Sequence, residues 1–144
     1  MPLCSVVLSH NNVENDRYKF NLDTLFRQQY SNYIVVYVDD ASEDETGEAA
    51  QKYIDQYAPH PEKFKVVINS VNQGAIANEI MATEKYCPED SILLIGPDGD
   101  DGLVGSHIFQ LYNYYFQTQD IWVAWSQQIC ISQKSKCFDA RPIS

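Results

Sequence analysis

The sequence is poor in basic residues, which excludes one large class of partners. Ten Lys and Arg are scattered along 144 residues that also hold twenty Asp and Glu, so the formal net charge is -10. Binding to a nucleic-acid backbone needs a stripe of Lys and Arg, and we therefore expect no nucleic-acid partner. An anionic ligand would need a metal ion or backbone amides as the local positive element.

Long apolar runs and zinc-type cysteine spacings are also missing. No run reaches the roughly 18 apolar residues of a membrane helix, and no charged leader with a long apolar segment follows Met1. We therefore expect a cytoplasmic protein without a transmembrane segment. The four cysteines form no CxxC motif. We expect them to be reduced thiols, with Cys4 as a small core residue, while Cys130 and Cys137 can meet across a hairpin.

What the chain does have is an alternation of short apolar runs with segments of helical period. The apolar runs, typical of buried strands, are 3–9, 33–38, 64–69 and 91–95, with one or two more strands in 120–132. The segments of helical period are 19–31, 47–57, 75–86 and 103–117. Near-continuous apolar strands that alternate with helices indicate a single α/β domain around a mainly parallel sheet.

A cluster of polar residues follows each of the four main expected strands. The clusters are SHNN (9–12), DDASED (39–44), NSVNQG (69–74) and PDGDDG (97–102). In open α/β sheets, ligands bind beyond the carboxyl ends of the strands, so we expect a binding site at this edge. Turns favour the same residue types, but four such clusters are more than turns require.

The last cluster places three aspartates in four residues: Asp98, Asp100 and Asp101. Carboxylates this close disfavour one another's ionisation. A solvated turn tolerates that cost, whereas a bound cation removes it. Because Mg²⁺ and Mn²⁺ prefer oxygen ligands, often only one or two of them from protein, this loop is a candidate metal site.

The order of these clusters resembles that of the family-two glycosyltransferases, which are inverting enzymes with the GT-A fold. SVVLSHN is similar to that family's first strand, and LDTLFRQQYSNYIVVYVDDASEDET to its helix and second strand. NQGAIANEIM resembles its Asn-x-Gly turn and helix, and LLIGPDGDDGL its DXD-type metal loop. The resemblance implies a Rossmann-like, three-layer α/β/α fold. It also implies metal-dependent transfer of a sugar, with inversion, from a nucleotide-diphosphate sugar such as a UDP-sugar to an unidentified glycan, lipid or protein acceptor.

The resemblance assigns roles at the two ends of the donor. Asp100 or Asp101 would coordinate Mn²⁺ or Mg²⁺, and Asp98 or its neighbour would contact the ribose; the alignment can slip by one, so the single roles stay open. Asp40 would accept the imide N–H of uracil. The nucleoside pocket would be lined by Ser9, His10 and Asn11. His10 stands where the family often has Tyr, and is either a stacking ring or a turn residue in solvent.

The third motif is carried by Asn72, Gly74 and Asn78, which would complete the nucleotide site. Asn78 either touches the ligand or only caps or bridges the helix and its loop. Ala77 stands where the family usually has Arg, so one polar or phosphate contact of the family is missing here.

Beyond the metal loop, no general base can be recognised. Inverting transfer needs a carboxylate that deprotonates the acceptor hydroxyl, and the acids that follow, Asp120 and Asp139, lie in no known motif. We expect residues 1–144 to form a single glycosyltransferase-like domain, truncated after the metal loop and one following helix-strand unit. The alternative is a non-catalytic nucleotide-sugar-binding remnant or interaction module that lacks the acceptor half. A receiver-like domain ranks last, because the Lys expected at a late strand end is missing.

Overall fold

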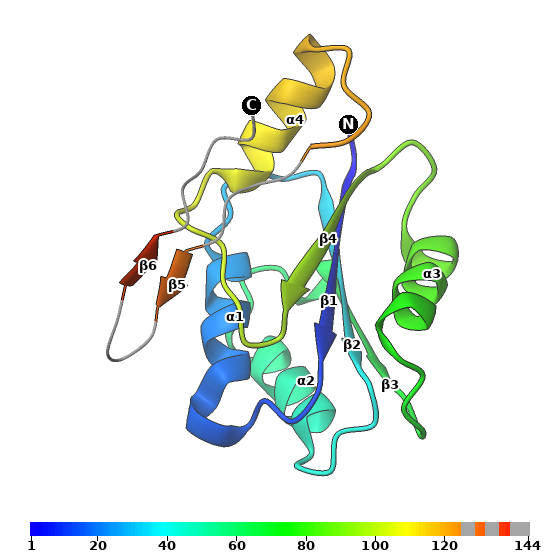
Figure 1. The fold of residues 1–144 in the computed structure, drawn as a ribbon, viewed down its shortest axis with the longest axis vertical. Coiled ribbons are helices and arrows are strands. Elements are labelled where there is room, and N and C mark those ends of the chain that lie inside the picture. The colour runs from blue at the N-terminus through cyan, green and yellow to red at the C-terminus, as the bar shows by residue number, and fades with distance from the viewer. Residues whose placement is uncertain (125–128, 132–135, 139–144) are drawn as a thin grey trace.

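The computed structural model describes residues 1–124, 129–131 and 136–138. Its main elements alternate as expected (Figure 1) and are β1 (Leu3–Ser9), α1 (Arg17–Phe26), β2 (Tyr33–Asp39), α2 (Thr46–Tyr57), β3 (Phe64–Ile68), α3 (Ala75–Tyr86), β4 (Ile92–Asp98) and α4 (Ile108–Thr118). Short 3-10 turns, η1 (Glu14–Asp16) and η2 (Pro61–Lys63), precede α1 and β3.

The first four strands form one sheet in the order β3-β2-β1-β4. All three pairings are parallel, as predicted, and Leu3 of β1 lies between Tyr33 of β2 and Ile92 of β4. The chain builds outward from β1 to β2 and β3, then crosses back to place β4 on the other side of β1. The topological switch point, where such sheets bind ligands, is therefore the gap between β1 and β4.

Helices cover both faces of this sheet, which gives the three layers expected from the sequence (Figure 1). On one face, Leu3 and Val7 of β1 pack with side chains of α1 and α2, among them Leu22 and Ile54. On the other face, alternate residues such as Val6 pack with α3. Because every central strand is buried on both sides, its sequence is apolar almost throughout instead of alternating.

One prediction about the cysteines is wrong. Cys4 is fully buried, as expected, but it is disulfide-bonded to Cys87 at the end of α3, so this pair is not reduced. The two residues are 83 positions apart and meet only because α3 packs on the face of β1 that carries Cys4. The predicted hairpin is confirmed: β5 (Ile129–Ile131) and β6 (Lys136–Phe138) are antiparallel, and Cys130 is the register partner of Cys137.

Three element bounds differ from the sequence prediction by three residues or more. The first helix is shorter than 19–31 at its end, β4 runs on from Ile95 to Asp98, and α4 starts at Ile108 instead of Leu103. The segment between β4 and α4 is an irregular loop that is hydrogen-bonded to Thr24 of α1 and to Gln28 just after α1, and these bonds keep it out of the helix. Within the described residues, no helix has both the length and the apolar character needed to cross a membrane.

Candidate functional site

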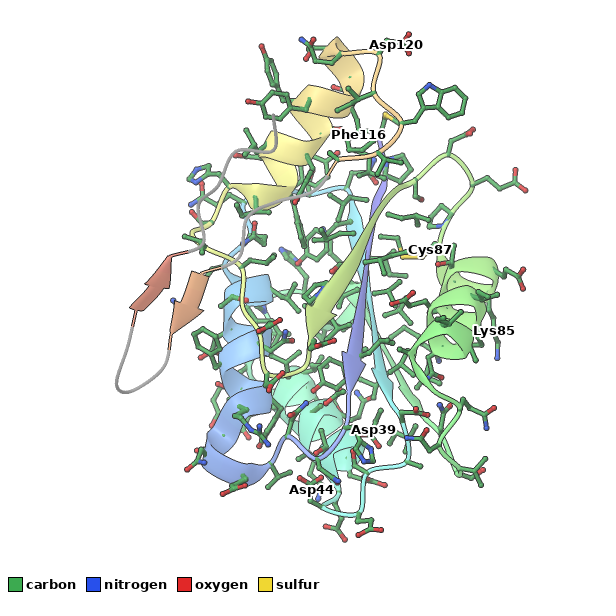
Figure 2. All side chains as sticks on the ribbon, viewed as in Figure 1. Asp39, Asp44, Lys85, Cys87, Phe116 and Asp120 are labelled. Atoms are coloured by element: carbon green, nitrogen blue, oxygen red, sulfur yellow. A yellow bond between two sulfur atoms is a disulfide. The ribbon has the colours of Figure 1, made fainter. Side chains whose placement is uncertain are left out.

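Backbone hydrogen bonds gather the polar clusters at one edge of the sheet. The amide of Asp40 donates to the carbonyl of Ser9 at 2.9 Å, and the amide of Gly99 donates to the carbonyl of Leu8 at 2.7 Å. These bonds continue the parallel pairings past the ends of β1, β2 and β4. Figure 2 shows Asp39 at this edge and Asp120 at the opposite end of the molecule. The clusters predicted to form the site are therefore neighbours, and Asp120 is not among them.

The loop after β1 is fastened to the loop after β2. The amides of Asn11 and Asn12 donate to the hydroxyls of Ser42 (3.0 Å) and Thr46 (2.8 Å). The amide of Val13 donates to the Asp44 carboxylate at 3.0 Å. Burial acts to raise the pKa of Asp44, but the hydrogen bonds from Thr46 and Val13 outweigh it and lower that pKa. The loop after β1 and the loop after β2 are thus held together by three hydrogen bonds.

His10 is held by both of its ring nitrogens. Its Nδ1 lies 3.0 Å from the carbonyl oxygen of Asp40, and its Nε2 lies 3.1 Å from Nδ2 of Asn11. A carbonyl only accepts, so Nδ1 donates to Asp40 and Nε2 accepts from the side chain of Asn11. The side chain is exposed, and with its edges bonded only the ring faces remain for a ligand.

Asp40 is buried and accepts three hydrogen bonds from the loop that joins β3 to α3. Its Oδ1 accepts from the amide of Gln73 (2.8 Å) and from Nδ2 of Asn69 (2.9 Å), and its Oδ2 accepts from the amide of Gly74 (2.9 Å). Burial acts to raise the pKa of Asp40, but these bonds, that of Gln73 first, lower it to about 2. A carboxylate has about four acceptor positions, so one position on Oδ2 is left.

The third motif lies against Asp40, as predicted from its place after β3. Nδ2 of Asn72 is 3.4 Å from the Asp40 carbonyl, and Gly74 adopts a φ of 83° directly before α3. Asn78 is only 2% exposed, and its Oδ1 accepts from Nδ2 of Asn69 at 2.8 Å. Asn78 therefore bridges the helix and its loop, while its own Nδ2 is buried without a hydrogen-bond partner.

Ser9 lies beneath the metal loop. Its hydroxyl is bonded to Nδ2 of Asn12 (2.8 Å) and to the hydroxyl of Tyr37 (2.9 Å), and the residue is 3% exposed. A Cβ on Gly99 would lie 2.5 Å from the Ser9 hydroxyl and 2.6 Å from Nδ2 of Asn12. Only glycine fits this close approach, so the metal loop rests directly on the end of β1.

The carboxylates of the metal loop repel one another, as their spacing predicts. Burial, followed by the negative charges of Asp101 and Asp100, raises the pKa of Asp98. Among the described residues, no group of three or more His, Cys, Asp and Glu side chains is placed to hold a metal ion. Mg²⁺ and Mn²⁺ do not need such a cage, since they commonly take one or two carboxylates and complete their shell with phosphates and water. The loop fits that kind of site.

Buried polar side chains of α1 and of the residues directly after it position the metal loop, and the sequence prediction missed them. Asn21 donates through Nδ2 to the carbonyls of Asp98 (3.0 Å) and Asp101 (2.8 Å). Thr24 accepts from the amide of Leu103, and Gln28 donates to the carbonyl of Gly105. Asn21 and Thr24 lie on the buried face of α1 and Gln28 follows its end, so all three are spaced by three or four residues. This spacing is the signal that could have revealed them.

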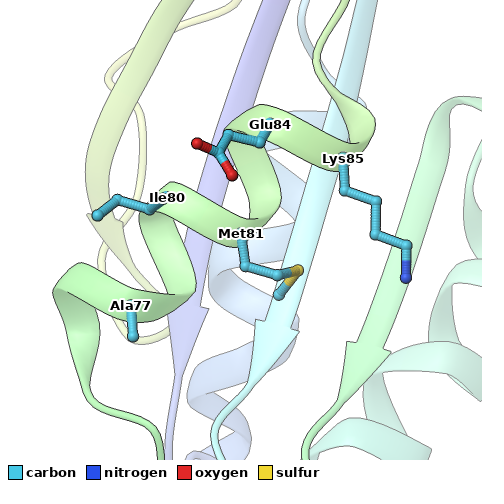
Figure 3. Close-up of a pocket in the computed structure, with 5 residues that line it drawn as sticks. All are labelled: Ala77, Ile80, Met81, Glu84 and Lys85. Carbon is cyan, nitrogen blue, oxygen red and sulfur yellow. The ribbon is translucent and has the colours of Figure 1, made fainter.

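The hollow on the outer side of α3 is a separate feature. It is lined by Ala77, Ile80, Met81, Glu84 and Lys85 (Figure 3). None of the residues predicted to bind the nucleotide or the metal lines it. The candidate site is therefore formed by the loops that follow β1, β2, β3 and β4.

A parallel sheet of this order, with carboxylate loops on both sides of its switch point, defines a Rossmann-like domain. Solved structures share the fold. S. aureus TarS matches with a TM-score of 0.61 and 21% identity over 81% of this chain and 20% of that chain. S. aureus TarS 1-349 in complex with UDP matches with a TM-score of 0.61 and 20% identity, over 81% of this chain and 32% of that one.

A third match is the mannosyltransferase PcManGT from Pyrobaculum calidifontis in complex with GDP-Man and Mn²⁺. Its TM-score is 0.56 and its identity 26%, over 69% of this chain and 28% of that one. The chain thus spans between 20% and 32% of the length of these three structures. No curated protein sequence matches it.

The chain belongs to glycosyl transferase family 2, whose family model matches residues 5–132. The match takes in all four strand-end clusters and continues past the metal loop. The predicted family and the predicted GT-A fold are both confirmed.

Proposed function

We propose that this domain binds a nucleotide-diphosphate sugar and a divalent cation, and that it supplies the donor side of an inverting sugar transfer. One observation carries the proposal. In a family 2 chain, the loop after β2, which carries Asp40, and the Asp98–Asp101 loop lie on opposite sides of β1, at the switch point of the sheet. A nucleoside and its diphosphate can span such a gap, with the base at one side and the metal at the other.

On the base side, the remaining acceptor position of Asp40 suits an imide N–H such as that of uracil. The face of His10 stacks on the base, and Asn11 closes the pocket beside it. Asn72 and Gly74 form the opposite wall, which Asn78 supports from α3. Ser9 shapes the floor at the end of β1.

On the phosphate side, Asp98 would contact the ribose and Asp100 or Asp101 would hold Mn²⁺ or Mg²⁺. A cation held there would offset the repulsion within the carboxylate cluster and would supply Lewis-acid stabilisation of the leaving diphosphate. Complexes of the structurally similar proteins support this donor class, because TarS was solved with UDP and with UDP-GlcNAc and PcManGT with GDP-Man and Mn²⁺.

The proposal assigns no catalytic base to either of the two acids that follow the metal loop. Asp120 lies at the far end of the molecule (Figure 2), and Asp139 lies outside the described residues. The position of Asp120 favours the second candidate, a nucleotide-sugar-binding domain that does not catalyse transfer by itself. The acceptor, a glycan, lipid or protein, is proposed on the sequence alone.

Calorimetric titration of UDP in the presence and absence of Mn²⁺ tests the donor site. We expect metal-dependent binding that weakens at least about tenfold, or by 1.4 kcal/mol, in the Asp100→Ala, Asp101→Ala double variant. The matched control is Glu84→Ala with Glu89→Ala, which removes the same charge from exposed positions outside the site. If UDP binding is independent of metal, or if the double variant binds as the wild type does, the site assignment is wrong. Release of UDP from a UDP-sugar would separate the enzyme from the non-catalytic domain.

A further inference from the structure

Arg17 is the cation that meets the metal loop. It is the first residue of α1, and its Nη1 lies 3.5 Å from Oδ2 of Asp100. In the part of the chain that the structure describes, this is the one ion pair made by the Asp98–Asp101 loop. An acidic protein that binds an anionic donor needs positive charge at this point, and Arg17 supplies it.

The guanidinium of Arg17 is held in place by the loop after β1. Nη2 donates to the carbonyl of Asn11 at 2.8 Å, and Nε donates to the carbonyl of Glu14 at 3.3 Å. Two backbone carbonyls thus fix the group, and the contact with Asp100 adds little energy at this exposure. The position of the guanidinium is therefore set by the β1 loop and does not depend on Asp100.

This arrangement leaves part of the guanidinium unused. The group has five N–H donors, and three of them serve Asn11, Glu14 and Asp100. One donor on each terminal nitrogen remains, and the side chain is 40% exposed. Two unused donors on a planar, permanently charged group can donate to phosphate oxygens.

Three other cations in the described residues are engaged elsewhere. Lys19 pairs with Asp16 at 2.8 Å, Lys63 lies over the ring of Tyr33, and Lys85 lines the hollow on α3. We propose that Arg17 is an anion-binding residue of the donor site. Its guanidinium contacts the diphosphate between the loop that carries Asn11 and the Asp98–Asp101 loop. This inference rests on the proposed function, since it assumes that a nucleotide diphosphate occupies the strand ends.

The test compares a ligand that has phosphates with one that has none. Wild type and Arg17→Gln are titrated with UDP and with uridine, each in the presence of Mn²⁺. We expect Arg17→Gln to weaken UDP binding about tenfold, the loss of roughly one charge-assisted contact, and to leave uridine binding unchanged. Arg17→Lys keeps the charge but loses the planar fork, so it should bind UDP with intermediate affinity.

Lys19→Gln is the matched control, because it removes the same charge two residues further along α1. It should leave the affinity for UDP unchanged, which separates a local contact from a change in net charge. UDP binding by Arg17→Gln that equals the wild type would overturn the inference, and so would an equal loss for UDP and uridine. If the wild type binds neither ligand, the proposed function itself fails.

Discussion

Replacing Asp40 with asparagine should loosen the loop that joins β3 to α3. The carboxylate accepts from three donors of that loop: the amides of Gln73 and Gly74 and Nδ2 of Asn69. An asparagine at this position has the same shape but only one acceptor oxygen. Whichever way its amide is turned, at least one loop donor faces an NH₂ group instead of an oxygen.

The size of the effect follows from these contacts. Asp40 is 7% exposed, so a donor that loses its partner there is largely shielded from water. The loss of one hydrogen bond to a charged group, together with one unpaired buried donor, should lower the free energy of unfolding by about 2–4 kcal/mol at pH 7.

The pH dependence gives the prediction a second, independent signature. The pKa of Asp40 is lowered from 3.8 to about 2 in the folded protein. A carboxyl with a depressed folded-state pKa stabilises the fold above its unfolded pKa, and this stabilisation is lost as the pH falls through the folded pKa. The difference in stability between wild type and Asp40→Asn should therefore be full at pH 7 and narrower at pH 3.

Urea denaturation followed by intrinsic fluorescence measures both quantities. Glu43→Gln is the control, because this substitution removes the same charge from an exposed side chain nearby. The free energy of unfolding of this variant should match that of the wild type at pH 7. A loss below about 1 kcal/mol for Asp40→Asn would refute the unpaired-donor argument. A gap that stays the same at pH 3 and pH 7 would refute the ionised, hydrogen-bonded state of Asp40.

Two further substitutions probe how the metal loop is held. Asn21→Ala removes the donor of both the Asp98 and Asp101 carbonyls, and should cost about 1–3 kcal/mol of unfolding free energy. It should also weaken Mn²⁺-dependent UDP binding, whereas Gln56→Ala, at an exposed position of α2, should change neither. Gly99→Ala forces a Cβ against the anchored Ser9 hydroxyl, and should cost about 1–3 kcal/mol by overpacking. An unchanged denaturation midpoint for Gly99→Ala would show that the loop can lift off β1.

The sequence predicts the frame of this domain well because the frame depends on local patterns. Strands buried on both faces read as apolar throughout, and the bounds of α3, Ala75–Tyr86, agree with the predicted 75–86. The gathering of the polar clusters is also predictable, since the carboxyl ends of parallel strands share one edge. The four clusters could therefore be assigned to one site before their partners were known.

The partners themselves depend on long-range contacts that no local pattern contains. The start of α4 is displaced because Gln28 and Thr24 bind the segment before it. The bond between Cys4 and Cys87 follows from the packing of α3 on β1, and their spacing in the sequence gives no hint of it. The sequence likewise shows that Asp40 follows a strand. It does not show that the carboxylate oxygens of Asp40 accept hydrogen bonds from the loop that joins β3 to α3.

The Cys4–Cys87 bond closes a covalent ring in the chain. The ring runs from β1 to the end of α3 and contains the loops that carry His10, Asp40 and Asn72, whereas the Asp98–Asp101 loop lies outside it. A single backbone cut within the ring, for instance in the exposed segment at residues 70–73, therefore leaves both pieces covalently joined until a reductant is added. Under oxidising conditions the loops after β1, β2 and β3 therefore stay covalently attached to the domain after one cut. A cut between Cys87 and the Asp98–Asp101 loop, in contrast, removes the covalent link between that loop and the ring.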